Sequence, residues 1–97
     1  PHYAASKAGV ISLTRSFSKI YAKSQIRVNC VSPGVIETKM VSKMISKFGK
    51  KKILESYLIK RLGNARDVVE ICYFLSSPKS QFITGQTYNV NGGSYFG

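Results

Sequence analysis

Tyr3 and Lys7 are the two residues of this sequence whose types and spacing could do chemistry together. Side chains four positions apart lie on one face of an α-helix, so a helix here would bring a phenol and an ammonium side by side. A phenol is a poor acid or base near neutrality, and a neighbouring ammonium lowers its pKa by favouring the phenolate. Such a pair could exchange a proton with a reacting oxygen. The same spacing also occurs in helices where a surface Tyr rests on a Lys stem.

The segment from Tyr3 to about Lys23 is predicted to be the helix that positions this pair. Apolar residues recur there at spacings of three and four, which indicates one apolar stripe: Val10, Leu13, Phe17 and Ile20. The small residues beside it would let a second helix approach closely, or would pack on the chain's own sheet: Ala4, Ala5, Ala8, Gly9 and Ser12. Ser6 lies off the Tyr3–Lys7 face and is interpreted as helix packing.

The β-branched segment from Ile26 to Val31 is predicted to be a parallel strand buried on both faces. Pro33 and Gly34 would end it, because Pro lacks a ladder donor and Gly permits a tight turn. Ligands of open parallel sheets bind at the carboxyl ends of the strands. The turn over residues 33–38 is therefore expected to form one wall of a ligand site.

Three further elements complete the predicted order. The Lys-rich stretch from Met40 to Tyr57 is predicted to form two short helices with a flexible joint at Gly49. The family resemblance described below implies that this stretch is a mobile substrate lid. Asn64 is predicted to cap a helix, with Asp67 as the acidic partner of a capping box. That helix is predicted to end near Pro78. Its inner apolar stripe consists of Val68, Ile71, Cys72 and Leu75. A last strand is predicted over residues 87–90, followed by a turn of Asn91, Gly92 and Gly93.

The order of these motifs resembles the short-chain dehydrogenase/reductase family, from its catalytic Tyr to the C-terminus. The matching segments are Tyr3–Gly9, Arg27–Gly34, Glu37-Thr38, Arg61-Leu62-Gly63, Ile83–Gln86 and Val90–Gly93. Within the family, the residues of 34–40 and Asn91-Gly92-Gly93 are most similar to the 3-oxoacyl-(acyl-carrier-protein) reductases. Sugar and alcohol dehydrogenases of the family share most of them.

The resemblance implies an α/β fold, namely the C-terminal part of a Rossmann-type doubly wound parallel sheet, with its last two strands and flanking helices. Residues 1–97 would be the C-terminal portion of a single Rossmann-fold reductase domain, without the N-terminal cofactor-binding half. The family's glycine-rich cofactor turn, its catalytic Ser and the Asn of its proton relay would all lie upstream. The segment alone is therefore expected to be inactive.

The activity that the resemblance implies is NAD(P)H-dependent reduction of a 3-oxoacyl-(acyl-carrier-protein) to the 3-hydroxyacyl form in fatty acid synthesis. Tyr3 would be the general acid, and Lys7 would lower its pKa and bind the nicotinamide ribose. The Ile36 backbone would meet the nicotinamide amide. The full set of expected cofactor-binding residues is Tyr3, Lys7, Pro33, Gly34, Ile36 and Thr38, the last near the carboxamide or pyrophosphate. NADP(H) is expected rather than NAD(H), although the selecting residue lies upstream.

A homodimer or homotetramer is expected, assembled through the first helix and the last strand, where Tyr95 and Phe96 could pack on another subunit. Two other functions remain open: a short-chain dehydrogenase acting on a sugar or alcohol, and a non-catalytic assembly remnant.

The net charge of +11 raises the question of a nucleic-acid partner. The lysines are dispersed and no nucleic-acid-binding motif accompanies them, so a solvated face, or a basic rim attracting an acidic carrier protein, is the better interpretation. No apolar run is long enough to span a bilayer, and we expect no membrane association and a cytoplasmic or organelle-matrix location. Cys30 and Cys72 are expected to be reduced core residues, and no metal site is expected.

Overall fold

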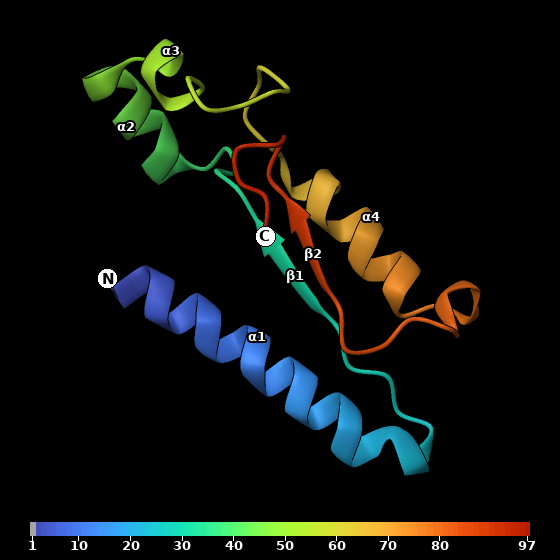
Figure 1. The fold of residues 1–97 in the computed structure, drawn as a ribbon. Coiled ribbons are helices and arrows are strands. Elements are labelled where there is room, and N and C mark those ends of the chain that lie inside the picture. Colours follow the sequence, from blue (N-terminus) through green and yellow to red (C-terminus); the bar gives the residue numbers. More distant parts are fainter. Residues whose placement is uncertain (1) are drawn as a thin grey trace. The chain divides into compact units, whose positions relative to one another are not determined.

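The computed structural model describes residues 2–97 (Figure 1). The helices and strands follow the order α1 (His2–Tyr21), η1 (Ala22–Ser24), β1 (Cys30–Pro33), α2 (Lys39–Phe48), α3 (Lys50–Ile53), α4 (Ala65–Leu75), η2 (Pro78–Ser80) and β2 (Thr87–Val90). The chain divides into two compact units. The first comprises residues 2–31 and Cys72–Tyr88, and the second comprises Ser32–Ile71 and Asn89–Gly97.

The strands β1 and β2 pair as a two-stranded parallel sheet. In the first unit the backbone N–H of Cys30 donates to Gln86 O at 2.8 Å, and in the second the N–H of Gly34 donates to Val90 O at 2.8 Å. Both bonds have the same offset along the sequence, as a parallel ladder requires. The predicted α/β class is confirmed, and so are the bounds predicted for the last strand.

The position predicted for the first strand was wrong by several residues. The prediction placed it at Ile26–Val31, whereas β1 covers Cys30–Pro33. The preceding stretch makes other bonds: the N–H of Val28 donates to the Thr84 hydroxyl at 3.1 Å rather than to a strand backbone. Pro33 is tolerated in the strand because the N–H groups of Cys30 and Gly34 face β2, so the position of its missing donor faces away from the ladder.

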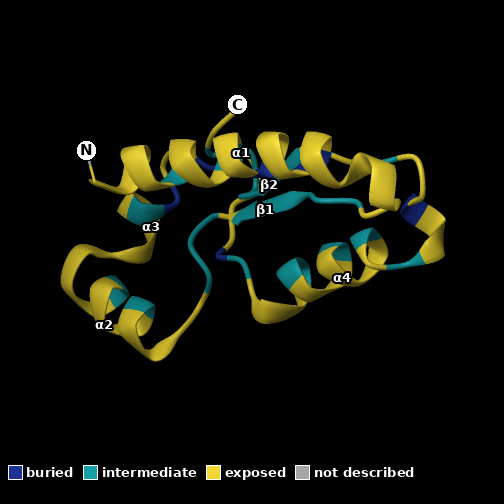
Figure 2. Cartoon of the chain, turned by 90° about the horizontal axis from the view of Figure 1, so that it is seen from below, coloured by how far each residue is buried: buried dark blue, intermediate teal, exposed yellow. Residues whose placement is uncertain are grey.

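The helix α1 confirms the predicted helical segment, but its apolar stripe is exposed. Val10, Leu13 and Ile20 are each more than half exposed. The buried positions are Thr14 and Ser18, whose hydroxyls donate to carbonyls of the preceding turn at 2.8 and 2.7 Å. Most of α1 is accordingly coloured as exposed in Figure 2. Within the first unit, the apolar side of the helix therefore remains uncovered.

Arg27 closes the C-terminal end of α4 in the first unit. Its guanidinium donates to Leu75 O at 2.8 Å, to the Ser80 hydroxyl at 3.0 Å and to Ser77 O at 3.2 Å. The last carbonyls of a helix have no intrahelical partner, and a cation at that end is also favoured by the helix dipole. Ser80 itself is 1% exposed, so this polar cluster orders the segment after α4.

The second unit contains a small apolar core of Leu54, Tyr57 and Leu62. Partly buried residues from the turn after β1 and from α2 and α3 pack against it: Val35, Val41, Ile45 and Ile53. Gly49 separates α2 from α3 with φ of +82°, which confirms the predicted joint. The second helix is shorter than predicted, because α3 ends at Ile53 and Tyr57 turns into the core instead.

The start of α4 is a reciprocal capping box, as predicted. The N–H of Asp67 donates to Asn64 Oδ1 at 3.1 Å, and the N–H of Asn64 donates to Asp67 Oδ2 at 2.9 Å. The burial predicted for Cys72 was wrong, since this residue is exposed on α4 while Cys30 is half-buried. Both thiols are free.

Candidate active site

Tyr3 and Lys7 lie in the first two turns of α1, in the first unit. Four residues separate them within one helix, so both side chains leave the same face. Tyr3 is 71% exposed, whereas Lys7 is half-buried. The helix thus has the geometry that the proton-transfer hypothesis requires, and the chemical role of the pair remains a prediction.

The turn after β1 belongs to the second unit and is held by bonds to two other segments. The N–H of Val35 donates to the Tyr57 hydroxyl at 2.8 Å. Gly63 then pairs with Ile36 in a parallel bridge: its N–H donates to Val35 O at 3.0 Å, and its carbonyl accepts from the Glu37 N–H at 2.8 Å. The turn is therefore held on one side by hydrogen bonds.

The backbone of Ile36 faces away from this bridge. The flanking groups, the carbonyl of Val35 and the N–H of Glu37, both point to Gly63. Successive peptide groups of an extended chain point in opposite directions, so the N–H and carbonyl of Ile36 point away from Gly63. A donor and an acceptor presented together can bind a carboxamide, which also has one of each.

Thr38 has a structural role at the end of this turn. Its hydroxyl accepts a 3.2 Å hydrogen bond from the N–H of Val41, which makes it the N-cap of α2. An N-cap satisfies one of the free N–H groups at a helix start. Thr38 thereby joins the predicted ligand wall to α2.

Gly34 permits a close approach of the backbone at the end of β1. A Cβ atom at this position would lie 2.9 Å from Asn91 Cα, Asn91 Cβ and the Tyr57 hydroxyl. Cβ atoms essentially never lie so close to other atoms, so a side chain at residue 34 would force its neighbours to move. Two of the three neighbouring atoms belong to Asn91, in the turn after β2. The two strand ends can lie this close only because residue 34 has no side chain.

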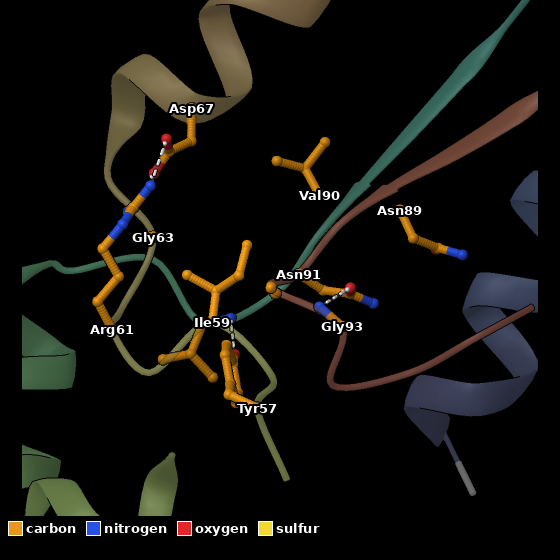
Figure 3. A pocket seen from close by; sticks show the side chains of 12 residues that line it. Tyr57, Ile59, Arg61, Gly63, Asp67, Asn89, Val90, Asn91 and Gly93 are labelled. Carbon is orange, nitrogen blue, oxygen red and sulfur yellow. Dashed lines mark hydrogen bonds and ion pairs between the residues drawn. The ribbon is translucent and has the colours of Figure 1, made fainter.

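A cavity of about 360 Å³ opens in the second unit, at the carboxyl ends of β1 and β2 (Figure 3). Tyr57, Ile59 and Arg61 line it from the loop after α3. The remaining wall comes from the two strand ends, Gly63 and α4: Gly34, Val35, Gly63, Asp67, Asn89, Val90, Asn91, Gly92 and Gly93. Asn89 Oδ1 is buried without a hydrogen-bond partner among residues 2–97. An unpaired buried acceptor in a cavity wall can take a donor from water or a ligand.

Arg61 and Asp67 form a two-bond ion pair beside this cavity. Nη1 of Arg61 lies 2.8 Å from Asp67 Oδ2, and Nη2 lies 3.0 Å from Oδ1. The pKa of the Asp67 carboxyl is lowered to about 2, first by the Arg61 hydrogen bonds and then by the Asn64 N–H. The same hydrogen bond raises the pKa of Arg61. Asp67 therefore anchors both the helix cap and the loop before it.

Only one predicted cofactor-binding residue, Gly34, lines the cavity. Pro33, Ile36 and Thr38 belong to the same unit but are not among the lining residues, and Tyr3 and Lys7 lie in the first unit. The sequence analysis did not predict that Tyr57 is buried, at 5% exposure, or that Arg61 pairs with Asp67. The pairing of Arg61 could have been predicted from the sequence, because Arg61 stands three residues before the predicted N-cap, Asn64, and so close to the capping-box acid.

Among residues 2–97, no three His, Cys, Asp or Glu side chains gather closely enough to hold a metal ion. No helix in this described range has both the length and the apolar character needed to cross a membrane.

Comparison with protein-family models gives a match over residues 1–95 to a model described as enoyl-(acyl carrier protein) reductase. A 3-oxoacyl-[acyl-carrier-protein] reductase from Buchnera aphidicola is 44% identical over 94 residues, which are 97% of this chain and 38% of that protein. The chain thus spans well under half the length of the curated relatives it matches.

Solved structures share the fold. A protein from Agrobacterium tumefaciens assigned as a 2-deoxy-D-gluconate 3-dehydrogenase, with bound NADP, superposes with a TM-score of 0.88 at 35% identity, over 97% of this chain and 39% of that one. A 4-hydroxyisoleucine dehydrogenase complexed with NADH gives a TM-score of 0.90 at 33% identity, over 98% of this chain and 40% of that one.

Proposed function

Because this chain belongs to the short-chain dehydrogenase/reductase family, we propose that the complete protein is an NAD(P)H-dependent carbonyl reductase. The proposed reaction reduces a 3-oxoacyl-(acyl-carrier-protein) to the 3-hydroxyacyl form in fatty acid synthesis. The observation that carries it is the Tyr3–Lys7 pair on one face of α1, at the family's catalytic motif. The name of the Buchnera relative supports the choice of substrate.

Tyr3 is the proposed general acid. A phenol that is 71% exposed on its helix can reach a substrate oxygen, and it would donate its proton as negative charge develops there. Lys7, one turn along, would stabilise the resulting phenolate and donate to the ribose hydroxyls. A bound dihydronicotinamide supplies the hydride to the carbonyl carbon.

The turn over residues 33–38 is the proposed nicotinamide wall. The N–H and carbonyl of Ile36, which face away from Gly63, fit a carboxamide, and Gly34 lets the ends of the two strands lie close together beside them. Pro33 and Thr38 bound the turn, and Thr38 would lie near the carboxamide or pyrophosphate. NADP(H) is the proposed cofactor rather than NAD(H); the two solved relatives described above contain one each.

We further propose that residues 1–97 are the C-terminal portion of a single Rossmann-fold domain of a cytoplasmic or organelle-matrix enzyme. The chain covers 38% of the Buchnera relative, which supports its being one part of a longer protein. We also propose a homodimer or homotetramer assembled through α1 and β2, as the family resemblance implies.

The test uses the complete protein with the variants Tyr3→Phe and Lys7→Ala. NADPH and NADH oxidation is followed with a 3-oxoacyl thioester. Each variant is expected to lose at least about 100-fold in kcat, the usual size of a general-acid contribution. Near-normal turnover by either variant would disprove the acid assignment.

A second candidate function is a dehydrogenase for a sugar or alcohol, favoured by the likeness to the two dehydrogenases of known structure. Both candidate functions use the same Tyr3–Lys7 pair, so only the substrate that the complete protein accepts distinguishes them. Oxidation of polyols or hydroxy acids by the complete protein, without reduction of a 3-oxoacyl thioester, would select this alternative.

A further inference from the structure

A tight turn of Asn91, Gly92 and Gly93 follows β2, and the proposed proton transfer makes no use of it. Asn91 Oδ1 accepts a hydrogen bond from the N–H of Gly93 at 3.1 Å (Figure 3). A side-chain oxygen that accepts from the N–H two residues on forms an Asx turn. Gly92 and Gly93 have φ of +60° and +80°, a conformation that glycine adopts without steric cost. The Asn91 side chain therefore fixes a turn that otherwise consists of two glycines.

The turn presents the carbonyl of Gly92 to the loop that follows α3. The N–H groups of Leu58 and Ile59 both donate to this carbonyl at 2.9 Å. The glycines also let the loop approach closely. A Cβ atom on Gly92 would lie 2.9 Å from Tyr57 Cδ2, and one on Gly93 would lie 2.8 Å from a methyl carbon of the Leu58 side chain. Hydrogen bonds and close packing therefore hold this loop on the turn.

Lys60 fixes the same loop on its other side. Its ammonium donates to Leu54 O at 3.1 Å and to Glu55 O at 3.2 Å, just after α3. Leu54 is buried and belongs to the core of the second unit. Tyr57 lies in sequence between this attachment to the core and the attachment to the turn, so both help to place its ring.

Two contacts connect the turn to the proposed nicotinamide wall over residues 33–38. The first runs through Tyr57, whose hydroxyl accepts from the N–H of Val35 at 2.8 Å. The second is direct, because a Cβ atom on Gly34 would lie 2.9 Å from both Cα and Cβ of Asn91. The wall is thus held by Asn91 itself and by the loop that the turn holds.

We propose that Asn91 is a positioning residue for the nicotinamide; resting on the proposed function, its Asx turn holds the wall over residues 33–38 where the cofactor binds. Without the Oδ1 acceptor, the two glycines would gain access to many other backbone conformations. The Gly92 carbonyl, the Tyr57 hydroxyl and the Val35 N–H would then no longer be held in one arrangement. The expected result is weaker cofactor binding with the proton donor intact.

The Asn91 amide makes a second bond, which the experiment must separate from the first. Its Nδ2 donates to Tyr95 O at 3.0 Å and so holds the chain end rather than the turn. Asn91→Ala removes both bonds. Asn91→Asp keeps the acceptor for the Gly93 N–H and loses the donor to Tyr95. Asn91→Ser keeps a hydroxyl that forms such turns more weakly.

The first experiment measures the Kd of NADPH and NADH by fluorescence titration of the complete protein, and KM and kcat with a 3-oxoacyl thioester. Asn91→Ala is expected to raise Kd and KM for the cofactor about five- to tenfold, the equivalent of one hydrogen bond, with a smaller change in kcat. Asn91→Asp should stay within about twofold of wild type, and Asn91→Ser should lie between the two.

Gln86→Ala is the matched control for the loss of a local amide bond. Gln86 Nε2 donates to Thr84 O at 3.2 Å before β2 begins, in the first unit. Its substitution should leave cofactor binding unchanged. A control that raises Kd as much as Asn91→Ala would overturn the proposal.

Hydrogen exchange supplies a readout that does not depend on turnover. In Asn91→Ala the N–H groups of Leu58, Ile59 and Val35 should exchange faster, because their acceptors are no longer fixed. The amides of α4 should keep their wild-type rates. Equal acceleration in α4 would show a general loss of stability and would overturn the positioning role.

Failure of the reductase proposal gives a different result. If wild-type protein binds a nicotinamide cofactor but reduces no 3-oxoacyl thioester, the proposed reaction fails, and the Kd series alone decides on Asn91. No cofactor binding by wild type would overturn both proposals. If Asn91→Ala does not fold, the comparison of Asn91→Ser with Asn91→Asp decides. An Asn91→Asp variant that binds cofactor less tightly than Asn91→Ser would assign the effect to the Tyr95 bond and overturn the proposal.

Discussion

The hydroxyl of Tyr57 accepts a 2.8 Å hydrogen bond from the backbone N–H of Val35, so a buried phenol holds the turn that follows β1. Tyr57 is 5% exposed and belongs to the core of the second unit. The position of the proposed nicotinamide wall therefore depends on a residue well outside the wall. A substitution in this core should therefore shift or loosen the turn after β1.

Tyr57→Phe is expected to destabilise the complete protein by about 1–2 kcal/mol, because the N–H of Val35 would lose its partner in a partly buried place. Urea unfolding measures the loss. Tyr73→Phe is the matched control, since Tyr73 is 79% exposed and its change should stay within about 0.5 kcal/mol. Equal effects of the two substitutions would contradict the role given to the Tyr57 hydroxyl.

Gly34→Ala is expected to destabilise by about 1–3 kcal/mol, because its Cβ would lie 2.9 Å from Asn91 and from the Tyr57 hydroxyl. Gly9→Ala is the comparison: it lies inside α1, nothing stands within 4 Å of its Cβ, and alanine should stabilise the helix by about 0.5–1 kcal/mol. Thermal unfolding measures both. A destabilising Gly9→Ala in the complete protein would indicate that another helix approaches α1 closely.

Stability should fall in acid partly through Asp67. Its pKa is lowered to about 2 in the folded protein by Arg61, below the value of about 3.9 in unfolded chains. The carboxylate therefore contributes stability above about pH 4, and that contribution is lost as pH falls from about 4 towards 2. The difference in unfolding free energy between wild type and Asp67→Asn should shrink across this window.

Glu70→Gln supplies the control for this pH profile. Glu70 also pairs with an arginine, Arg66, at 3.1 Å, but both side chains are largely exposed. Such pairs contribute little to stability. A profile in which Glu70→Gln changes the acid limb as much as Asp67→Asn would refute the assignment.

Arg27→Met is expected to cost about 2–3 kcal/mol, because the carbonyls of Leu75 and Ser77 and the hydroxyl of Ser80 would lose a charged donor. Hydrogen exchange should show faster opening at the end of α4. The control is Arg15→Met on exposed α1, which should leave the exchange of α4 unchanged. Unchanged protection at Leu75 and Ser77 in Arg27→Met would count against the cap.

Residues 1–97 alone are expected to show a broad thermal transition and no tight NADPH binding. Three apolar residues are buried among the described residues, Leu54, Tyr57 and Leu62, and this is a small core for a chain of 97 residues. Circular dichroism and fluorescence titration measure the two properties. A sharp, cooperative transition would show that the segment is an independent domain.

Local chemistry allowed several elements to be predicted. The capping box of Asn64 and Asp67 depends on residues close in sequence, and its prediction is confirmed. The bounds predicted for the strand over Thr87–Val90 are also confirmed. The motif order from Tyr3 onwards also identified the family correctly.

Contacts between distant segments were harder to predict. The bounds of β1 depend on where β2 offers hydrogen bonds, and the pattern of Ile26–Val31 contains no information about that partner. Tyr57 lies in a lysine-rich stretch without clear periodicity, so nothing in its surroundings indicated burial. The apolar side of α1 was recognisable, but only the structure shows that Val10 and Leu13 remain exposed within the first unit.

The parallel pairing of β1 and β2 has a consequence for biosynthesis. Val28 and Thr84, bonded partners at the entrance to the sheet, are 56 residues apart. During translation, β1 leaves the ribosome well before its neighbour is made, and an unpaired strand edge promotes misassembly. The nascent chain would have to protect this edge with strands already synthesised or with a chaperone.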